Sequence, residues 1–320
     1  MKWLGIDIAK RKFDLAVLNN GKIRSKVFEN TLEGYEALLD WLATQGYARE
    51  ELHACMEATS VYYEKLATFL HDAGIRVSVV NPLQIKAFGE SLLTRQKTDR
   101  ADAALIARFA EQQSPMLWQP ASREIRELQR LLARLEAVQQ MSVQEQNRQH
   151  EAEGESLASV QRMLTQLKAE EEKLRQMIRD HIDQNPNLRE QHALLTSIPG
   201  VGDQVSSHFM AWLRPERFDD ARQAVAFVGL SPRHRESGDS VRGKSRLSKV
   251  GHARLRKILY FPAMSAIRCN TAAKALAERL TASGKSGKVV IGAVMRKMIH
   301  WMFGVLKSGH AFDPDLALAK

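Results

Sequence analysis

Cysteine is scarce in this chain of 320 residues, which holds only Cys55 and Cys269, far apart in the sequence. Neither belongs to a CxxC pair or to a Cys/His pattern of the kind that binds zinc. The pattern therefore argues against a zinc domain, and free thiols in a reducing compartment are its simplest interpretation.

Signals for secretion, membrane insertion and ATP binding are also missing. The first residues, MKWLGIDIAKRKFD, become charged too soon for a signal peptide. The most apolar late run, 289–306, is interrupted by Arg296, Lys297 and His300, which is typical of a buried amphipathic helix. The segment GKSGK at 284–288 lacks the spacing of a P-loop and a strand before it. We expect a cytoplasmic protein without a membrane partner.

Negative charge is in the minority, because 47 Lys and Arg oppose 37 Asp and Glu and leave a formal net charge of +10. The pI of about 9.6 predicts an anionic partner, most often nucleic acid, although ribosomal and membrane-surface proteins share such values. Residues 231–260 hold nine basic and two acidic residues, so this stretch contributes +7. The excess charge is concentrated there.

Ser237 lies inside this basic stretch, between Glu236 and Gly238. Surrounding cations would attract a phosphodiester and stabilise charge that develops on its oxygens, which makes Ser237 a candidate nucleophile. The alternative is an ordinary loop serine in a basic phosphate-binding arm. Ser240, Ser245, Ser248 and His252 could be rivals or phosphate contacts. The cations predicted to bind nucleic acid are Arg233, Arg235, Arg242, Lys244, Arg246 and Lys249.

The first part of the chain reads as three antiparallel strands followed by alternating helices and strands. A short apolar run at 3–8 and runs of alternating character at 13–18 and 22–28 predict the strands, with Asn20-Gly21 as a hairpin turn. Thr31 can cap the helix that follows. Three antiparallel strands and then alternating β and α elements are the order of the ribonuclease H-like fold.

Acidic residues fall where such a sheet would use them. Asp7 ends the first predicted strand and Glu57 ends the fourth, and a carboxylate there is more often a ligand or catalytic group than structural. Thr98 is a predicted N-cap that places Asp99 and Asp102 on one face of the first helical turn. The alternative for this pair is an interaction with the helix dipole. Four converging carboxylates would need cations between them, and such oxygen ligands select Mg²⁺ or Mn²⁺.

Two prolines in 114–120 indicate a boundary, and apolar residues at heptad-like spacing follow it. They predict two long helices in a coiled-coil hairpin, paired within the chain, between chains, or both. Asn185-Pro186 ends this region. We therefore predict an α/β domain over 1–118, a coiled-coil region over 119–185 and a mainly helical domain over 186–320.

The segment IPGVG at 198–202 lies between two predicted helices and resembles the turn of a helix-hairpin-helix. Backbone amides at Gly200 and Gly202 could hold a DNA phosphate. A plain turn between two helices is the alternative.

Taken in order, these segments resemble bacterial insertion-sequence transposases with an N-terminal RuvC-like DEDD domain and a C-terminal transposase domain, the bridge-RNA-guided recombinases. The segments that match are GIDIAK at 5–10, MEATS at 56–60, VVNP at 79–82, KTDRADA at 97–103, IPGVG at 198–202, FVGLSPRHRESGDSVRG at 227–243 and RLSKVGHARLRKILY at 246–260. The resemblance runs almost from end to end.

The resemblance implies a specific activity and a specific set of partners. The metal-binding tetrad of the family falls on Asp7, Glu57, Asp99 and Asp102, and its serine nucleophile on Ser237. The implied reaction is strand exchange between donor and target DNA through a covalent phosphoserine link. The implied partners are a structured non-coding guide RNA, which pairs with both DNAs, and further copies of the chain in a dimer or tetramer.

Two other functions fit the residues less completely. A metal-dependent Holliday-junction-type endonuclease would use the acids to activate water and would leave no adduct, but it gives Ser237 no task. A non-enzymatic nucleic-acid-binding protein would not need all four acids.

Overall fold

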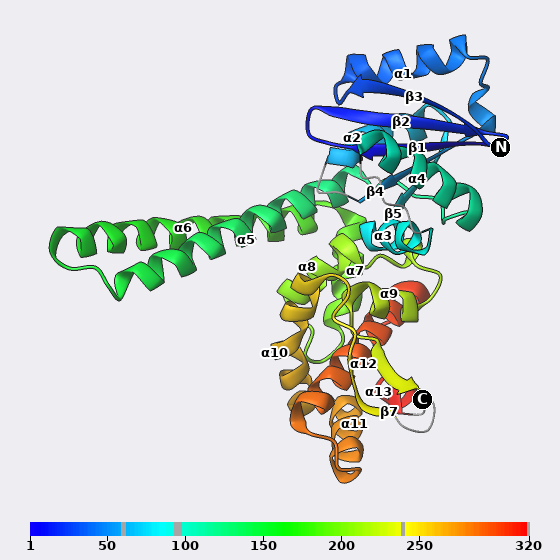
Figure 1. Ribbon diagram of the computed structural model, residues 1–320. Coiled ribbons are helices and arrows are strands. Elements are labelled where there is room, and N and C mark those ends of the chain that lie inside the picture. Colours follow the sequence, from blue (N-terminus) through cyan, green and yellow to red (C-terminus); the bar gives the residue numbers. More distant parts are fainter. Residues whose placement is uncertain (59–61, 93–97, 238–240, 319–320) are drawn as a thin grey trace. The chain divides into compact units, whose positions relative to one another are not determined.

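The computed structural model describes residues 1–58, 62–92, 98–237 and 241–318, without the side chains of 233–237 and 241–246 (Figure 1). The chain divides into two compact units, Met1–Pro120 and Ala121–Lys320. The second unit includes the predicted region 119–185 from Ala121 onward and the predicted domain 186–320, and the separation of these two stays a prediction.

A five-stranded sheet organises the first unit, in the order β3-β2-β1-β4-β5. Antiparallel pairing joins β1 to β2 and β2 to β3, whereas β1, β4 and β5 are parallel. The expected ribonuclease H-like arrangement is confirmed by this order and these directions. The strands are β1 (Lys2–Ile8), β2 (Lys12–Asn19), β3 (Lys22–Glu29), β4 (Leu52–Glu57) and β5 (Arg76–Val80).

Local sequence explains the hairpin between β2 and β3. Asn20 and Gly21 have φ angles of 48° and 77°, which a two-residue turn of this twist requires. Six consecutive residues of β2 are buried, whereas β3, at the edge of the sheet, is mostly exposed or half-buried.

Helices cover both faces of the sheet. Leu38 and Leu42 of α1, with Leu66 and Leu70 of α2, pack against one face. On the other face, α3 and α4 bury apolar residues that include Ile106. The bounds are α1 (Leu32–Thr44), α2 (Tyr62–Asp72), α3 (Pro82–Ser91) and α4 (Asp99–Gln113), with a 3-10 turn η1 (Arg49–Glu51) before β4.

The two predicted long helices are α5 (Arg123–Gln149) and α6 (Gly154–Gln184), and they pack on each other within the chain as a hairpin (Figure 1). The predicted seam residues Leu128 and Leu132 of α5 and Leu174 and Ile178 of α6 are buried together. Glu171 interrupts the apolar spacing of α6 and makes a polar contact, in which Ser142 Oγ donates to Glu171 Oε1 at 2.7 Å. A polar pair inside an apolar seam fixes the register of the two helices.

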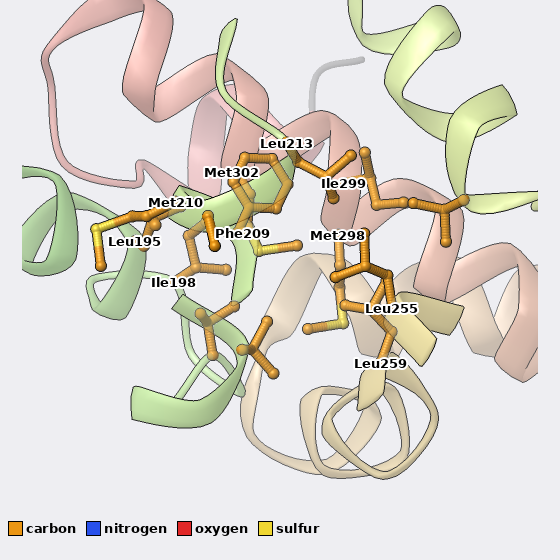
Figure 2. Close-up of a cluster of buried hydrophobic side chains, with 14 of the residues drawn as sticks. Leu195, Ile198, Phe209, Met210, Leu213, Leu255, Leu259, Met298, Ile299 and Met302 are labelled. Atoms are coloured by element: carbon orange, nitrogen blue, oxygen red, sulfur yellow. The ribbon is translucent and has the colours of Figure 1, made fainter. Parts of the chain in front are cut away.

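The rest of the second unit is a helical body with a two-stranded sheet. Figure 2 shows its core, where side chains from several helices meet, among them Phe209, Leu255 and Met302. The elements are α7 (Pro186–Thr196), α8 (Asp203–Trp212), a 3-10 turn η2 (Pro215–Arg217), α9 (Ala221–Val228), β6 (Pro232–Ser237), β7 (Val241–Leu247), α10 (Ala253–Cys269), α11 (Thr271–Ala282), α12 (Gly287–Ser308) and α13 (Pro314–Leu318).

Two expectations for this body have different outcomes. The run at 289–306 lies in α12, which by length and composition alone could cross a membrane, but more than half of its most apolar window is buried inside the protein. The interpretation as a buried helix therefore fits the structure. Met264 of α10 follows Leu255 and Leu259 at a spacing that predicts a core position, but it is 39% exposed and lies on the outer face of the helix with the exposed Tyr260 and Phe261.

Candidate functional site

Alternation along β1 and β4 directs Asp7 and Glu57 to the same face of the sheet. Leu4 and Ile6 of β1 and Met56 of β4 belong to the core beneath α1 and α2. Their sequence neighbours alternate to the opposite face, where α3 and α4 pack. Since Ile6 pairs with Met56 across the two parallel strands, the acids that follow each of these residues are neighbours at the ends of β1 and β4.

A glycine brings α4 against this face. A Cβ atom on Gly5 would lie 2.0 Å from the Ala103 carbonyl oxygen and 2.3 Å from the Ala107 nitrogen, so α4 packs directly on the backbone of β1. Thr98 caps the helix as predicted, since its hydroxyl accepts from the Ala101 N–H at 3.2 Å. The first turn, which carries Asp99 and Asp102, is thereby held beside the end of β1.

The predicted acids interact electrostatically, and Asp7 interacts with each of the other three. Burial raises the pKa of Asp7 to about 6, and the charges of Asp102 and Asp99 raise it as well. Burial also raises the pKa of Glu57, with the charges of Asp7 and Asp102 as further causes. Carboxylates that disfavour one another's ionisation are stabilised when a cation lies between them. Their hard oxygen atoms therefore fit Mg²⁺ or Mn²⁺ chemically.

Asp99 is in a different environment from the other acids. Its side chain is 62% exposed, and its Oδ2 lies 2.9 Å from Lys12 Nζ. The hydrogen bond from Lys12 lowers the pKa of Asp99. Among the described residues, no group of three or more His, Cys, Asp or Glu side chains is arranged so that it could hold a metal ion. The acids thus share one face of the sheet without forming a closed coordination group.

Asp14 is a further acid of this cluster that the sequence analysis missed. It pairs directly with Asp7 across β1 and β2, is only 8% exposed, and lies 3.3 Å from Lys12 Nζ through its Oδ2. Its charge is one of the causes that raise the pKa of Asp7. The available signal was the alternation in β2, which places Asp14 on the face opposite Phe13 and Leu15.

The basic stretch of the second unit forms a β-hairpin, which the sequence analysis expected as a loop. Ser237 is the last residue of β6, and its Cα pairs with that of Val241 in β7. Residues 238–240, with Ser240, lie outside the described part of the chain. Also outside it are the side chains of Ser237, Arg233, Arg235, Arg242, Lys244, Ser245 and Arg246.

Backbone hydrogen bonds fix the base of this hairpin. Ser248 donates to the Ser231 carbonyl at 2.9 Å, and His252 donates to the Phe227 carbonyl at 2.7 Å. The side chains of Ser248 and His252 accept from the backbone N–H groups of Val250 and Leu255, both at 3.3 Å. These two candidate rivals of Ser237 therefore have local structural roles.

Two cations of the basic stretch are used inside the fold. Arg254 forms an ion pair with Glu136, with 2.5 Å between Nη1 and Oε2, and donates to the Leu132 carbonyl at 2.6 Å. Arg256 donates to the Val228 carbonyl at 2.8 Å. The count of +7 thus overstates the charge available to a ligand. In contrast, Lys249 is exposed and is one of the predicted nucleic-acid contacts.

The two glycines of the helix-hairpin-helix-like turn have different surroundings. Gly200 has a φ of 98°, and a Cβ there would lie 2.9 Å from the Ala266 Cα, so it packs against α10. Gly202 is the N-cap of α8, and a Cβ atom on it would meet nothing within 4 Å. Packing thus accounts for Gly200, whereas phosphate binding at Gly202 stays a prediction.

Similarity to known proteins extends over most of the chain. A family described as "Transposase" matches residues 4–152, and the family "Transposase IS116/IS110/IS902 family" matches residues 192–278. The pilin gene-inverting proteins of Moraxella bovis and Moraxella lacunata are each 32% identical, over 97% of this chain and 97% of their own length. T. thermophilus RuvC in complex with a Holliday junction substrate is 16% identical, with a TM-score of 0.26 over 37% of this chain and 99% of that chain.

The two family matches follow each other in the same order as the two units of the structure. The Moraxella relatives extend the similarity over nearly the full length of both proteins. The chain therefore belongs to the IS110 family of transposases.

Proposed function

We propose that this transposase cleaves and exchanges DNA strands with a carboxylate site in its first unit and a serine nucleophile in its second. Asp7, Glu57, Asp99 and Asp102 would hold Mg²⁺ or Mn²⁺. The observation that carries the proposal is the gathering of acids where α4 packs on the sheet: after burial, the charge of Asp102 is the largest cause that raises the pKa of Asp7, and the charges of Asp7 and Asp102 help to raise the pKa of Glu57. A structural role alone does not require repelling acids to be gathered there.

Ser237 supplies the covalent chemistry in this proposal. Its Oγ attacks the phosphorus of a DNA phosphodiester and loses its proton, while the bond to the departing sugar oxygen breaks and that oxygen gains a proton. The resulting phosphoserine link is resolved when a sugar hydroxyl of another strand attacks the same phosphorus and releases the serine. A divalent cation, when bound, would stabilise the charge on the phosphate oxygens.

The relatives favour a rearrangement of DNA over simple hydrolysis. Pilin gene-inverting proteins are named for inverting a gene, which joins strands again after cleavage. Hydrolysis would leave free ends, whereas a phosphoserine link conserves the phosphodiester energy until the strands are rejoined. We therefore propose strand exchange between donor and target DNA in the cytoplasm, at the nucleoid.

We further propose that a structured non-coding RNA selects both DNAs by base pairing. The basic hairpin β6–β7 would then bind phosphates without reading sequence. The acids and Ser237 belong to separate units. A dimer or tetramer could therefore combine the acids of one copy with the serine of another.

An adduct assay tests the chemistry. The full chain is incubated with Mg²⁺, donor and target DNA and its co-purified RNA, and covalent protein–DNA complexes are separated under denaturing conditions. Ser237→Ala should abolish the adduct, whereas Ser248→Ala, which removes a hydroxyl with a local backbone role, should retain it. An adduct that persists in Ser237→Ala would disprove the nucleophile.

The same assay separates the alternative functions. Metal-dependent hydrolysis that leaves free ends and is unchanged in Ser237→Ala would indicate a Holliday-junction-type endonuclease. Full recombination by Asp7→Ala would show that the acids are not catalytic. Sequencing of co-purified RNA tests the guide, since a single enriched, structured RNA is expected and only random cellular RNA would contradict it.

A further inference from the structure

Lys12 joins two elements of the carboxylate site that are distant in sequence. Its Nζ lies 2.9 Å from Asp99 Oδ2 at the start of α4 and 3.3 Å from Asp14 Oδ2 on its own strand β2. Asp99 is 62% exposed, whereas the Asp14 side chain is 11% exposed. One ammonium group therefore bridges an exposed acid and a buried acid.

The bridge lies close to Asp7 as well, because Asp14 is paired with Asp7 across the two strands. Lys12 lowers the pKa of Asp7, against the effect of the neighbouring carboxylates. Its hydrogen bonds to Asp99 and Asp14 raise the pKa of Lys12 itself, so its charge is retained at neutral pH. Lys12 thus supplies positive charge at the point where negative charges accumulate.

The ion pair between Lys12 and Asp99 also explains why the acids do not form a closed coordination group. Asp99 directs a carboxylate oxygen toward β2, whereas Glu57 and Asp102 interact with Asp7. Within the described residues, no three such side chains could hold a metal ion together. A divalent cation would offer Asp99 twice the charge of an ammonium group, and a carboxylate can exchange one partner for the other without any covalent change.

We propose that Lys12 is the resident counter-cation of the carboxylate site, which holds Asp99 in the absence of a divalent cation and releases it when the cation binds. In the bound form Lys12 keeps its contact with Asp14 and leaves Asp99 free for the cation. This inference rests on the proposed function, because it assumes that the acids bind a divalent cation. Lys12 is a positioning residue in this scheme.

Mn²⁺ binding to the full chain, measured by the electron paramagnetic resonance of free Mn²⁺, tests the proposal. Lys12→Met keeps most of the apolar stem and removes the competing charge, so it should bind Mn²⁺ more tightly, by on the order of tenfold. Lys12→Arg should bind as the unaltered protein does. Lys10→Met is the matched control, since Lys10 is an exposed cation two residues away and, among the described contacts, forms no ion pair with the acids.

A second readout is thermal unfolding with and without Mn²⁺. Without the cation, Lys12→Met should unfold at a lower temperature than the unaltered protein. Addition of Mn²⁺ should raise the unfolding temperature of Lys12→Met by more than it raises that of the unaltered protein. Unchanged or weaker Mn²⁺ binding in Lys12→Met, with normal binding by the unaltered protein, would overturn the role of Lys12 alone. Absence of Mn²⁺ binding by the unaltered protein would overturn this role and the metal site together.

Discussion

Gly5 and Ala103 are in backbone contact, because a Cβ atom on Gly5 would lie 2.0 Å from the Ala103 carbonyl oxygen. The three atoms nearest to that Cβ position are Ala103 O, Ala107 N and Ala107 Cα, all in the main chain of α4, so no side chain can rotate to make room. The position of Asp99 and Asp102 beside Asp7 therefore depends on the absence of a side chain at residue 5.

We predict that Gly5→Ala displaces α4 and lowers the free energy of unfolding by about 3 kcal/mol, as expected for overpacking that only backbone movement relieves. Mn²⁺ affinity should fall with it. Urea unfolding and Mn²⁺ titration measure the two effects. Gly304→Ala is the control, because a Cβ on Gly304 of α12 meets nothing within 4 Å and alanine favours a helix. An equally stable Gly5→Ala protein would contradict the packing argument.

The raised pKa of Asp7 predicts that the free energy of unfolding of the cation-free protein depends on pH. Its pKa is raised from 3.8 to about 6 in the folded state, so the folded protein binds more protons than the unfolded chain between these values. The free energy of unfolding therefore falls as pH rises through this window, and the loss is complete above the folded pKa. The groups that surround Asp7 in this respect are Glu57, Asp102, Asp99, Asp14 and Lys12.

Asp7→Asn should accordingly stabilise the cation-free protein at pH 7.5 by about 1–2 kcal/mol, a figure reduced for solvent screening. Near pH 4 most of this gain should disappear, because residue 7 of the folded protein is then largely uncharged in the unaltered protein as well as in Asp7→Asn. Urea unfolding in a chelator at both pH values measures the difference. Asp40→Asn, on the exposed side of α1, is the control. A gain that is the same at both pH values would contradict the assigned cause.

Local signals explain why much of the first unit could be predicted. Thr98 as a cap, Asn20-Gly21 as a turn and the short apolar run that carries Asp7 each depend on a few adjacent residues. The part played by Asp14 depends instead on its register against Asp7, which only the assembled sheet fixes. Lys12 in turn meets Asp99 only after α4 has packed on β1.

The second unit was harder to predict for the same physical reason. Arg254 was counted in the excess charge of the basic stretch, although its partners Glu136 and Leu132 come from a distant helix. Charged and polar residues alternate in β6 and β7, so no apolar face marked these strands. Met264 had the spacing of a core residue but lies on the outer face of α10.

Cations of the basic hairpin should contribute to binding through counterion release. We predict that Arg242→Ala or Arg246→Ala weakens DNA binding and lowers the slope of log K against log salt concentration by about one for each lost phosphate contact. Binding measured by fluorescence anisotropy over a range of salt concentrations gives the slope. Arg130→Ala, at an exposed position of α5, is the control. An unchanged slope would place these arginines away from the phosphates.

Arg254 should behave differently, because its charge is used to hold α10 against α5. The guanidinium contacts Glu136 and the Leu132 carbonyl and lies over the Trp212 ring, 5.5 Å from its centroid. Arg254→Met leaves the Glu136 carboxylate without this partner, and we expect the free energy of unfolding to fall by about 2 kcal/mol. Lys257→Met, which removes an exposed cation of the same helix, should change it little.

A double-mutant cycle separates this structural role from nucleic-acid binding. With Glu136→Gln as the second change, the two substitutions should be coupled by about 1 kcal/mol in urea unfolding, since each removes the same ion pair. The salt slope of DNA binding should stay that of the unaltered protein, because Arg254 donates to groups inside the fold. Full additivity together with a lowered salt slope would instead make Arg254 a phosphate contact, and the base of the hairpin β6–β7 would then belong to the DNA-binding surface.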